Sequence, residues 1–87
     1  MSHPGDQVPT SWTTIPAIMR QLTFALGVAD ARAGRPFHRD YDLWHGNDQW
    51  GYERGRLWAV TAPRDLPLKR DGEINPDAVR YYHGDIL

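Results

Sequence analysis

The chain has 87 residues, of which 40% are hydrophobic and 24% charged, a balance typical of one small folded domain. It contains no cysteine, which excludes disulfide scaffolds, thiolate zinc sites and cysteine nucleophiles. The formal net charge of -1 is unfavourable for a general nucleic-acid binder.

No stretch approaches the ~18 uncharged apolar residues of a membrane span, because Arg20, Asp30 and Arg32 interrupt the best candidate. The first residues lack the basic and apolar regions of a signal peptide. We therefore expect a cytoplasmic protein with no membrane partner. Residues 1–11 combine proline and glycine with few apolar groups and predict a flexible N-terminal arm, whereas residues 12–87 predict a single small domain.

A first helix is predicted over about residues 15–33, where apolar residues recur at steps of three and four. Thr14 lies near its start and Pro16 falls in its first turn, where a missing N–H costs little. Gly34 is expected to end the helix, since glycine is common just after the last helical residue. The apolar stripe that we expect to be buried comprises Ile15, Ile18, Leu22, Ala25, Leu26, Ala29 and Ala33.

A second helix is predicted over about residues 48–62, capped by Asn47 or Asp48 and ended by Pro63. The simplest packing of two helices joined by one loop is an antiparallel hairpin. The expected buried side is marked by Trp50, Leu57 and Trp58, with a smooth strip at Gly51, Gly55 and Ala59 for close packing of another backbone. The long aromatic loop between the helices should fold back over them through Phe37, Tyr41, Leu43 and Trp44.

The C-terminal part predicts a small β-turn unit followed by a short helix. Asp71-Gly72 is a hairpin signal. A third helix is expected over about residues 75–83, with Asn75 as its cap and Pro76 as its first residue. Val79, Tyr82 and Ile86 would dock onto the helical hairpin. The predicted fold class is therefore mainly α with a small β unit.

No catalytic or metal-binding pattern stands out. His38, His45 and Asp40 are suitable ligand or acid–base types, but no histidine pair has a helical spacing of three or four residues. The sequence shows no nucleophile and no cofactor fingerprint. We therefore expect no enzyme activity, no metal and no cofactor, and the histidines are interpreted as loop residues.

The middle of the chain is rich in arginine and aromatic residues. Residues 32–70 hold eight basic and five acidic residues, whereas residues 71–87 are acidic. Trp50 and Trp58 are interpreted as core residues, while a role in binding stays open for Trp44 and Tyr52. Arg54 and Arg56 fall on different helix faces and would need the loop to serve one patch. The predicted partner-binding residues are Arg35, Arg39, Trp44, Arg54 and Arg56.

A family resemblance covers about residues 25–59. Its carrying residues are Gly27 and Gly34, seven apart, then Tyr41, Gln49-Trp50, and Gly55 four positions before Ala59. On these residues the chain resembles the ribosome modulation factor family of small bacterial proteins, which implies a close helical pair and binding to the ribosome. The pattern YERGRLWAVTAPRDLPLK with its Asn-Pro-capped helix is similar to small uncharacterised proteins of phages and prophages.

These features predict a small non-catalytic binding protein, encoded by a phage or prophage, that docks on a host protein or ribonucleoprotein complex. It would modulate or inhibit that complex, for example as an anti-CRISPR protein inhibits a CRISPR effector. The alternative is a ribosome modulator that contacts rRNA directly, as the resemblance implies. A small metal-dependent enzyme and a virion component are further alternatives. The basic middle and acidic tail are also compatible with a homodimer.

Overall fold

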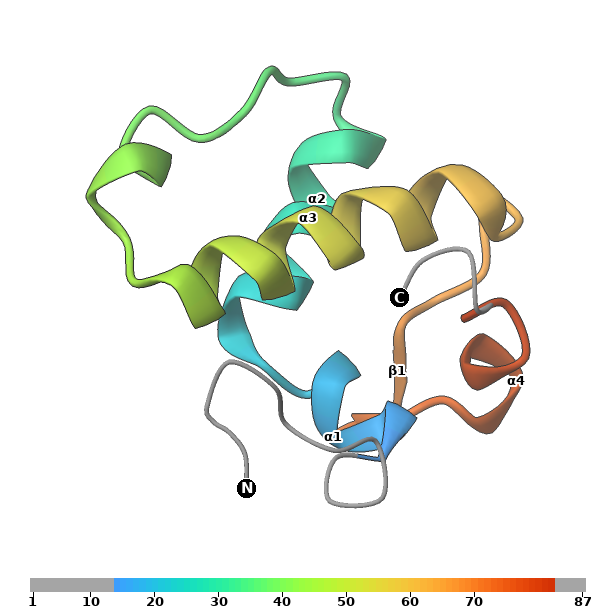
Figure 1. Ribbon diagram of the computed structural model, residues 1–87. Helices are drawn as coiled ribbons and strands as arrows, with labels where there is room; N and C mark the ends of the chain where they lie inside the picture. Colours follow the sequence, from blue (N-terminus) through green and yellow to red (C-terminus); the bar gives the residue numbers. More distant parts are fainter. Residues whose placement is uncertain (1–13, 83–87) are drawn as a thin grey trace.

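The computed structural model describes residues 14–82 (Figure 1). This part of the chain is mainly α-helical with a small two-stranded antiparallel sheet, which confirms the predicted fold class. The predicted N-terminal arm, residues 1–11, lies outside the described residues. The elements are α1 (Ile15–Met19), α2 (Leu22–Arg32), the 3₁₀ helix η1 (Tyr41–Leu43), α3 (Gly46–Thr61), β1 (Lys69–Arg70), β2 (Glu73–Ile74) and α4 (Pro76–Val79).

The first predicted helix is divided into α1 and α2. The Thr14 hydroxyl accepts a hydrogen bond from the amide of Ala17 at 3.2 Å, so the predicted start is confirmed. Gln21 has a ψ of 139°, an extended conformation that interrupts the helix. The break lets Met19 and Phe24 enter the same core, since a continuous helix would place them about 140° apart around its axis.

The predicted buried stripe is therefore only partly correct. Ile18 is buried as expected, but Leu22 is 84% exposed and Ala29 is also exposed. Because α2 begins anew after the break, its orientation is set by its own packing partners. Its buried residues are Phe24, Gly27, Val28 and Asp30.

The C-terminal end of α2 follows the prediction. Gly34 has a φ of 73°, in the left-handed region that favours glycine. Its amide bonds to the carbonyl of Ala31, and the amide of Arg35 bonds to the carbonyl of Asp30 at 2.8 Å. These two bonds form a Schellman motif that satisfies the last carbonyls of the helix.

Helices α2 and α3 pack against each other and run in the same general direction (Figure 1). Gln21, just before α2, lies against Gly51 near the start of α3, and Arg32 at the end of α2 bonds to the carbonyl of Pro63 beyond the end of α3. The predicted antiparallel orientation is therefore wrong. The connection over residues 33–45 can span about 40 Å, whereas α2 is about 16 Å long, so the chain can return to start α3 beside the start of α2.

Two glycines allow the helices to cross closely. A Cβ atom at Gly27 would lie 2.2 Å from the carbonyl oxygen of Tyr52, and one at Gly55 would lie 2.1 Å from that of Phe24. A Cβ at Gly51 would likewise overlap the Gln21 side chain. The predicted smooth strip is thus confirmed at both of its glycines.

Helix α3 begins at Gly46, two residues before the predicted start. Its N-cap is His45 rather than Asn47 or Asp48, and the His45 side chain makes no capping bond. The first turn is anchored instead by the Gln49 amide group, which donates to the carbonyl of Tyr41 at 2.9 Å. This contact ties α3 to the η1 segment.

The C-terminal predictions are confirmed at the hairpin and at the cap. Asp71 and Gly72 have φ values of 56° and 82°, as a tight hairpin turn with two left-handed residues requires. The Asn75 side chain accepts a hydrogen bond from the amide of Asp77 at 3.0 Å, and Pro76 begins α4. The helix ends at Val79, earlier than predicted.

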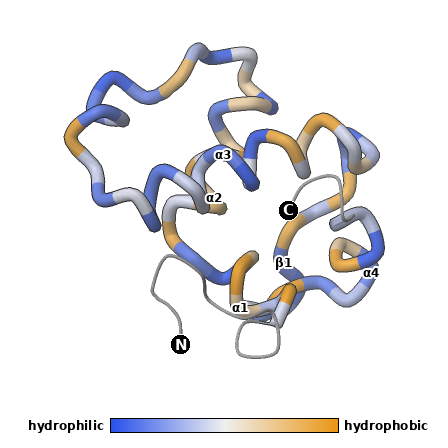
Figure 2. The backbone as a smooth tube through the Cα atoms, in the orientation of Figure 1, coloured by the Kyte–Doolittle hydropathy of each residue, from blue (hydrophilic) through white to orange (hydrophobic). Residues whose placement is uncertain are grey.

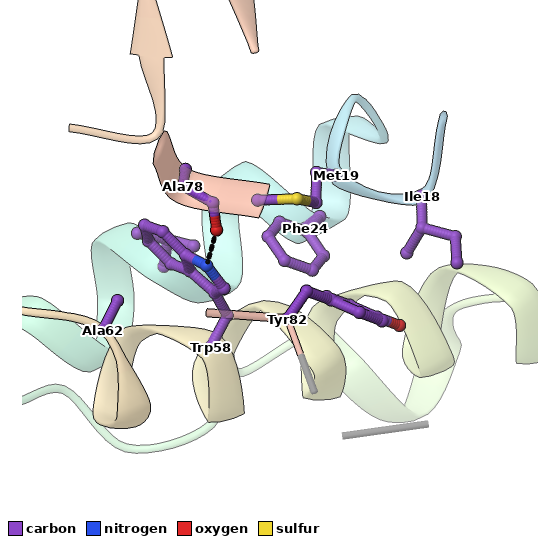
Figure 3. Close-up of a cluster of buried hydrophobic side chains, with 8 residues drawn as sticks. Ile18, Met19, Phe24, Trp58, Ala62, Ala78 and Tyr82 are labelled. Atoms are coloured by element: carbon purple, nitrogen blue, oxygen red, sulfur yellow. Dashed lines mark hydrogen bonds between the residues drawn. The ribbon is translucent and has the colours of Figure 1, made fainter. Parts of the chain in front are cut away.

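Buried residues from α1, α2, α3 and the C-terminal segment form one hydrophobic core (Figure 3). The ring of Phe24 lies 6.4 Å from that of Trp58 and 6.2 Å from that of Tyr82. The Trp58 indole N–H donates to the carbonyl of Ala78 at 2.8 Å, which ties the C-terminal segment to α3. Docking of Tyr82 is confirmed, whereas Ile86 lies outside the described residues. No helix within residues 14–82 is long and apolar enough to cross a membrane.

Candidate functional site

A groove of about 410 Å³ runs along α3, between this helix, the end of α2 and the following loop. Glu53, Leu57 and Val60 lie on successive turns of one face of α3. Arg54 and Arg56 fall on opposite sides of that face. We call this hollow the α3 groove; it is lined by Ala31, Phe37, Glu53, Arg54, Arg56, Leu57 and Val60.

The α3 groove carries three large apolar side chains that remain exposed. Val60 is 78% exposed, Phe37 50% and Leu57 42%. Leu57 was predicted on the buried side of its helix, and that prediction is wrong, since the glycine face is the buried one. Hydrophobic residues of α3 lie toward its C-terminal end (Figure 2). Burial of apolar surface is favourable by about 25 cal/mol per Å². Binding of an apolar partner over this cluster would therefore be favourable.

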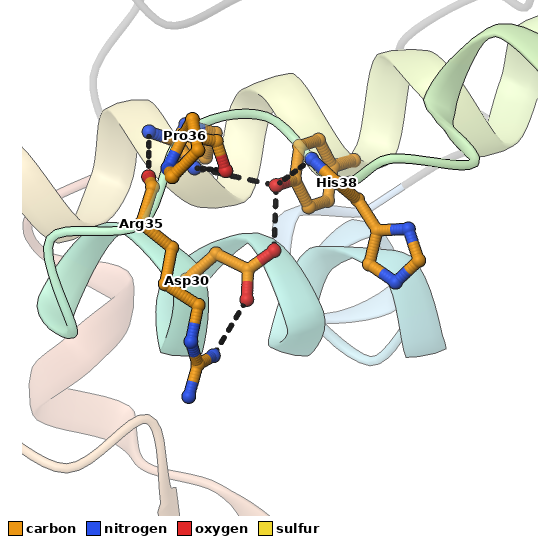
Figure 4. A network of polar contacts seen from close by, with 6 residues as sticks. Asp30, Arg35, Pro36 and His38 are labelled. Atoms are coloured by element: carbon orange, nitrogen blue, oxygen red, sulfur yellow. Dashed lines mark hydrogen bonds and ion pairs between the residues drawn. The ribbon is translucent and has the colours of Figure 1, made fainter.

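The loop side of the groove is held by a polar cluster, the loop clasp, which comprises Asp30, Arg35, His38, Tyr52 and Arg56. Figure 4 shows this network of polar contacts. The Tyr52 hydroxyl donates to Asp30 Oδ2 at 2.6 Å and accepts from the His38 amide at 2.9 Å. It also accepts from Arg56 Nη1 at 3.2 Å. A salt bridge of 2.8 Å joins Arg35 to Asp30. The start of the loop is thereby attached to both α2 and α3.

Arg56 connects the loop clasp to the α3 groove. Its guanidinium donates to the carbonyl of Arg35 at 2.8 Å and to that of Pro36 at 3.3 Å. It also lies over the ring of Phe37, 4.9 Å from the ring centroid. Phe37 in turn packs its ring against that of Tyr52, with 5.6 Å between centroids. These contacts hold Phe37 at the edge of the groove.

Burial and hydrogen bonding shift the pKa values of the loop clasp. Burial by itself raises the pKa of the Asp30 carboxyl, but the hydrogen bonds from Tyr52 and Arg35 outweigh burial and hold that pKa below its ordinary value. Burial and the bond to Asp30 raise the pKa of the Tyr52 phenol. At neutral pH the cluster therefore contains a carboxylate and a neutral phenol.

The outer part of the loop is fastened to the first half of α3. The Tyr41 hydroxyl donates to Glu53, and this bond raises the pKa of Tyr41 to about 12. The half-buried Trp44 packs its ring on that of Tyr52, with 5.2 Å between centroids. Folding back of the loop is thus confirmed for Tyr41 and Trp44, whereas Leu43 is 82% exposed, contrary to the prediction.

The structure brings two of the five predicted partner-binding residues to the α3 groove, whereas Arg35, Arg39 and Trp44 do not line it. Arg35 and Arg56 belong to the loop clasp, so they stabilise the fold. Arg54 Nη2 lies 3.5 Å from Glu53 Oε1, and the Arg54 side chain is only 16% exposed. Its guanidinium lies over the Trp50 ring, 5.4 Å from the ring centroid. Of the five, Arg54 and Arg56 line the α3 groove, together with the loop residue Phe37.

Of the remaining predicted residues, Arg39 is exposed in the loop and Trp44 is half-buried beside Tyr52. The role of all five residues in partner binding stays a prediction. Tyr52, which the sequence left open for base stacking, is fully buried, so it has no face to offer a base.

Sequence reasoning missed the three exposed apolar residues of the groove. Leu57 was expected on the buried side of its helix together with Trp50 and Trp58. A usable signal was present, because Leu57 and Val60 lie on the helix face opposite the glycine strip at Gly51 and Gly55. Phe37 carried no such signal, since its place depends on the loop clasp.

Two other features of the fold do not favour a functional site. A hollow of about 570 Å³ lies between α1 and the β-hairpin, but its apolar lining residues Ile74 and Val79 are half-buried and pack against the core. His38 Nδ1 accepts a bond from the Asp40 amide at 3.1 Å. Within the part of the chain that the structure describes, no three histidine or acidic side chains are grouped so that they could hold a metal ion.

Comparison of the chain with models of protein families, with curated proteins and with solved structures gives no match in any of the three. The function is therefore inferred from the residues and their geometry.

Proposed function

We propose that the protein is a small non-catalytic binding protein whose α3 groove docks onto a host protein or ribonucleoprotein complex and modulates or inhibits it. The observation that carries this proposal is the exposure of Phe37, Leu57 and Val60 around one hollow. Contiguous exposed apolar side chains rimmed by polar ones are typical of protein-interaction sites. A phage or prophage origin and an anti-CRISPR-type target belong to the same proposal and rest on the sequence alone.

The alternative is the ribosome-associated modulator that the sequence resemblance implies. The close helix crossing at Gly27 and Gly55 favours it, because small residues at these positions belong to the resemblance. Against it, many arginine side chains are bonded to oxygen atoms of this same chain and are less available to phosphates. These side chains are those of Arg32, Arg35, Arg54, Arg56, Arg64 and Arg70.

The test is a pull-down from bacterial host lysate with the tagged full-length chain, in nuclease-treated and untreated halves. Val60→Asp places a charge in the groove, and its matched control, Leu22→Asp, changes a residue that is similarly exposed but lies outside the groove. We expect a stoichiometric, nuclease-resistant partner with the wild type and Leu22→Asp, and its loss with Val60→Asp. Circular dichroism checks that both variants fold.

Two outcomes would contradict this proposal. Retention of the partner by Val60→Asp would exclude the α3 groove as the docking site. Capture of ribosomal proteins that disappear after nuclease treatment would favour the RNA-binding alternative. The predicted role of Arg39 is tested in the same experiment by Arg39→Ala, since this exposed residue can be changed without breaking the loop clasp.

A further inference from the structure

We propose that the α3 groove accepts an amphipathic helix of a partner protein, whose apolar stripe is flanked by aspartate or glutamate. This inference rests on the proposed function and names the chemistry of the partner segment. The groove extends over two turns of α3, from Glu53 to Val60, which is about 10 Å along the helix axis. Such a length matches the apolar anchors at i, i+3, i+4 and i+7 that a helix inserts into a groove.

The charge around the groove selects an acidic partner. Glu53 is the acidic residue of the lining, and its carboxylate is engaged by the Tyr41 hydroxyl and by Arg54. Arg56, on the opposite side of the groove from Arg54, donates hydrogen bonds to two backbone carbonyls and to the Tyr52 hydroxyl. Within residues 14–82 it forms no ion pair with a carboxylate, so its positive charge acts on whatever occupies the groove.

The same contacts disfavour a nucleic acid as the occupant. Bidentate recognition of phosphate needs an arginine fork with free N–H groups, and three of the five N–H groups of Arg56 already donate to oxygen atoms of this chain. The exposed apolar residues Leu57 and Val60 are aliphatic and cannot stack on a base. The Arg56 guanidinium lies over the ring of Phe37, and the rings of Tyr41 and Tyr52 pack nearly perpendicular to it.

The experiment titrates the ¹⁵N-labelled full-length chain with synthetic helical peptides and follows its amide signals by NMR. Three peptides share one leucine stripe and differ only in flanking residues, which are Glu, Gln or Lys; a short single-stranded RNA is the fourth probe. We expect the Glu peptide to shift the amides around Leu57 and Val60, and the Lys peptide to bind about tenfold more weakly, equivalent to about 1.4 kcal/mol.

A pair of variants separates charge from apolar contact. Val60→Asp and Val60→Lys both remove the same exposed side chain. We expect the Asp variant to lose affinity for the Glu peptide, whereas the Lys variant retains most of it. Leu22→Asp is the control and should bind like the wild type.

Several results would overturn the proposal: equal affinity for the Glu and Lys peptides, amide shifts outside the groove, no peptide binding, or RNA competing at the groove. These failures are distinct from failure of the proposed function. If Val60→Asp loses the cellular partner while the peptides do not discriminate by charge, only the partner chemistry is wrong. If Val60→Asp keeps the cellular partner, the docking site itself is wrong.

Discussion

Tyr52 shows how one buried hydroxyl organises a loop. A phenol can donate one hydrogen bond and accept two, and Tyr52 uses all three, with Asp30, His38 and Arg56 as its partners. Each partner comes from a different segment: α2, the loop and α3. The hydroxyl therefore positions the start of the loop, and with it the Phe37 edge of the α3 groove.

Replacing Tyr52 with phenylalanine tests this role. Tyr52→Phe leaves the buried Asp30 carboxylate without one of its donors, so we expect the free energy of unfolding to fall by about 1–3 kcal/mol. The measurement is urea denaturation followed by circular dichroism. Tyr81→Phe is the matched control, a half-buried tyrosine outside the loop clasp, with an expected change below about 0.5 kcal/mol. Equal effects of the two variants would argue against the clasp.

Asp30 makes stability depend on pH at the acid end. Its folded-state pKa lies below the unfolded value of about 3.9. The stabilisation is therefore fully present above that unfolded value and is lost as pH falls through the folded-state pKa. We expect Asp30→Asn to be less stable than the wild type at pH 7. We also expect its free energy of unfolding to fall less than that of the wild type as the pH is lowered. Denaturation curves measured from pH 7 down to acid would show this, and parallel profiles for the two proteins would contradict it.

At the scale of elements, the close crossing of α2 and α3 depends on two residues that have no side chain. Gly27 and Gly55 bring each helix against a backbone carbonyl of the other. Glycine lowers the intrinsic stability of a helix by about 1 kcal/mol relative to alanine. Here that cost is offset by close packing, which also places Trp58 and Phe24 in one core.

Alanine substitutions separate these two effects. Gly55→Ala would set a Cβ 2.1 Å from the Phe24 carbonyl oxygen, so we expect a loss of about 1–3 kcal/mol through overpacking. Gly46→Ala, at the first residue of α3, meets no atom within 4 Å and should be neutral or slightly stabilising. Thermal unfolding followed by circular dichroism measures both. A Gly55→Ala protein as stable as the Gly46→Ala protein would show that the helices do not cross at this separation.

At the scale of the whole molecule, a single core joins the helical pair to the C-terminal segment. Trp58 is fully buried and bonds to the carbonyl of Ala78, while Arg64 donates back to the carbonyl of Arg32. Because both parts share these contacts, we expect the domain to unfold in one cooperative transition.

Trp58→Phe tests the connection between the two parts. It removes the indole donor to the Ala78 carbonyl and leaves a gap in the core, so we expect a loss of at least about 2 kcal/mol. Far-ultraviolet circular dichroism and tryptophan fluorescence should report the same unfolding midpoint in the wild type. Trp50→Phe, at a half-buried position, should have a smaller effect. Two separate transitions in the wild type would contradict a shared core.

The candidate site was only partly accessible to sequence reasoning. Arg54 and Arg56 were selected by charge and do line the α3 groove, but selecting by charge also picked Arg35, which is paired with Asp30 in the fold. Residue type alone does not reveal whether an arginine faces solvent or bonds to its own chain. That depends on where a carboxylate or carbonyl from a distant segment lies.

The sequence by itself determined the features that depend on neighbours a few positions apart: the caps at Thr14 and Asn75, the stop at Gly34 and the turn at Asp71-Gly72. Only the tertiary structure decided the break before α2, the common direction of α2 and α3, and the exposure of Leu57. A turn is settled by local sterics and hydrogen bonds. Helix direction and the choice of buried face depend on the free energy of packing between distant segments, which no local pattern encodes.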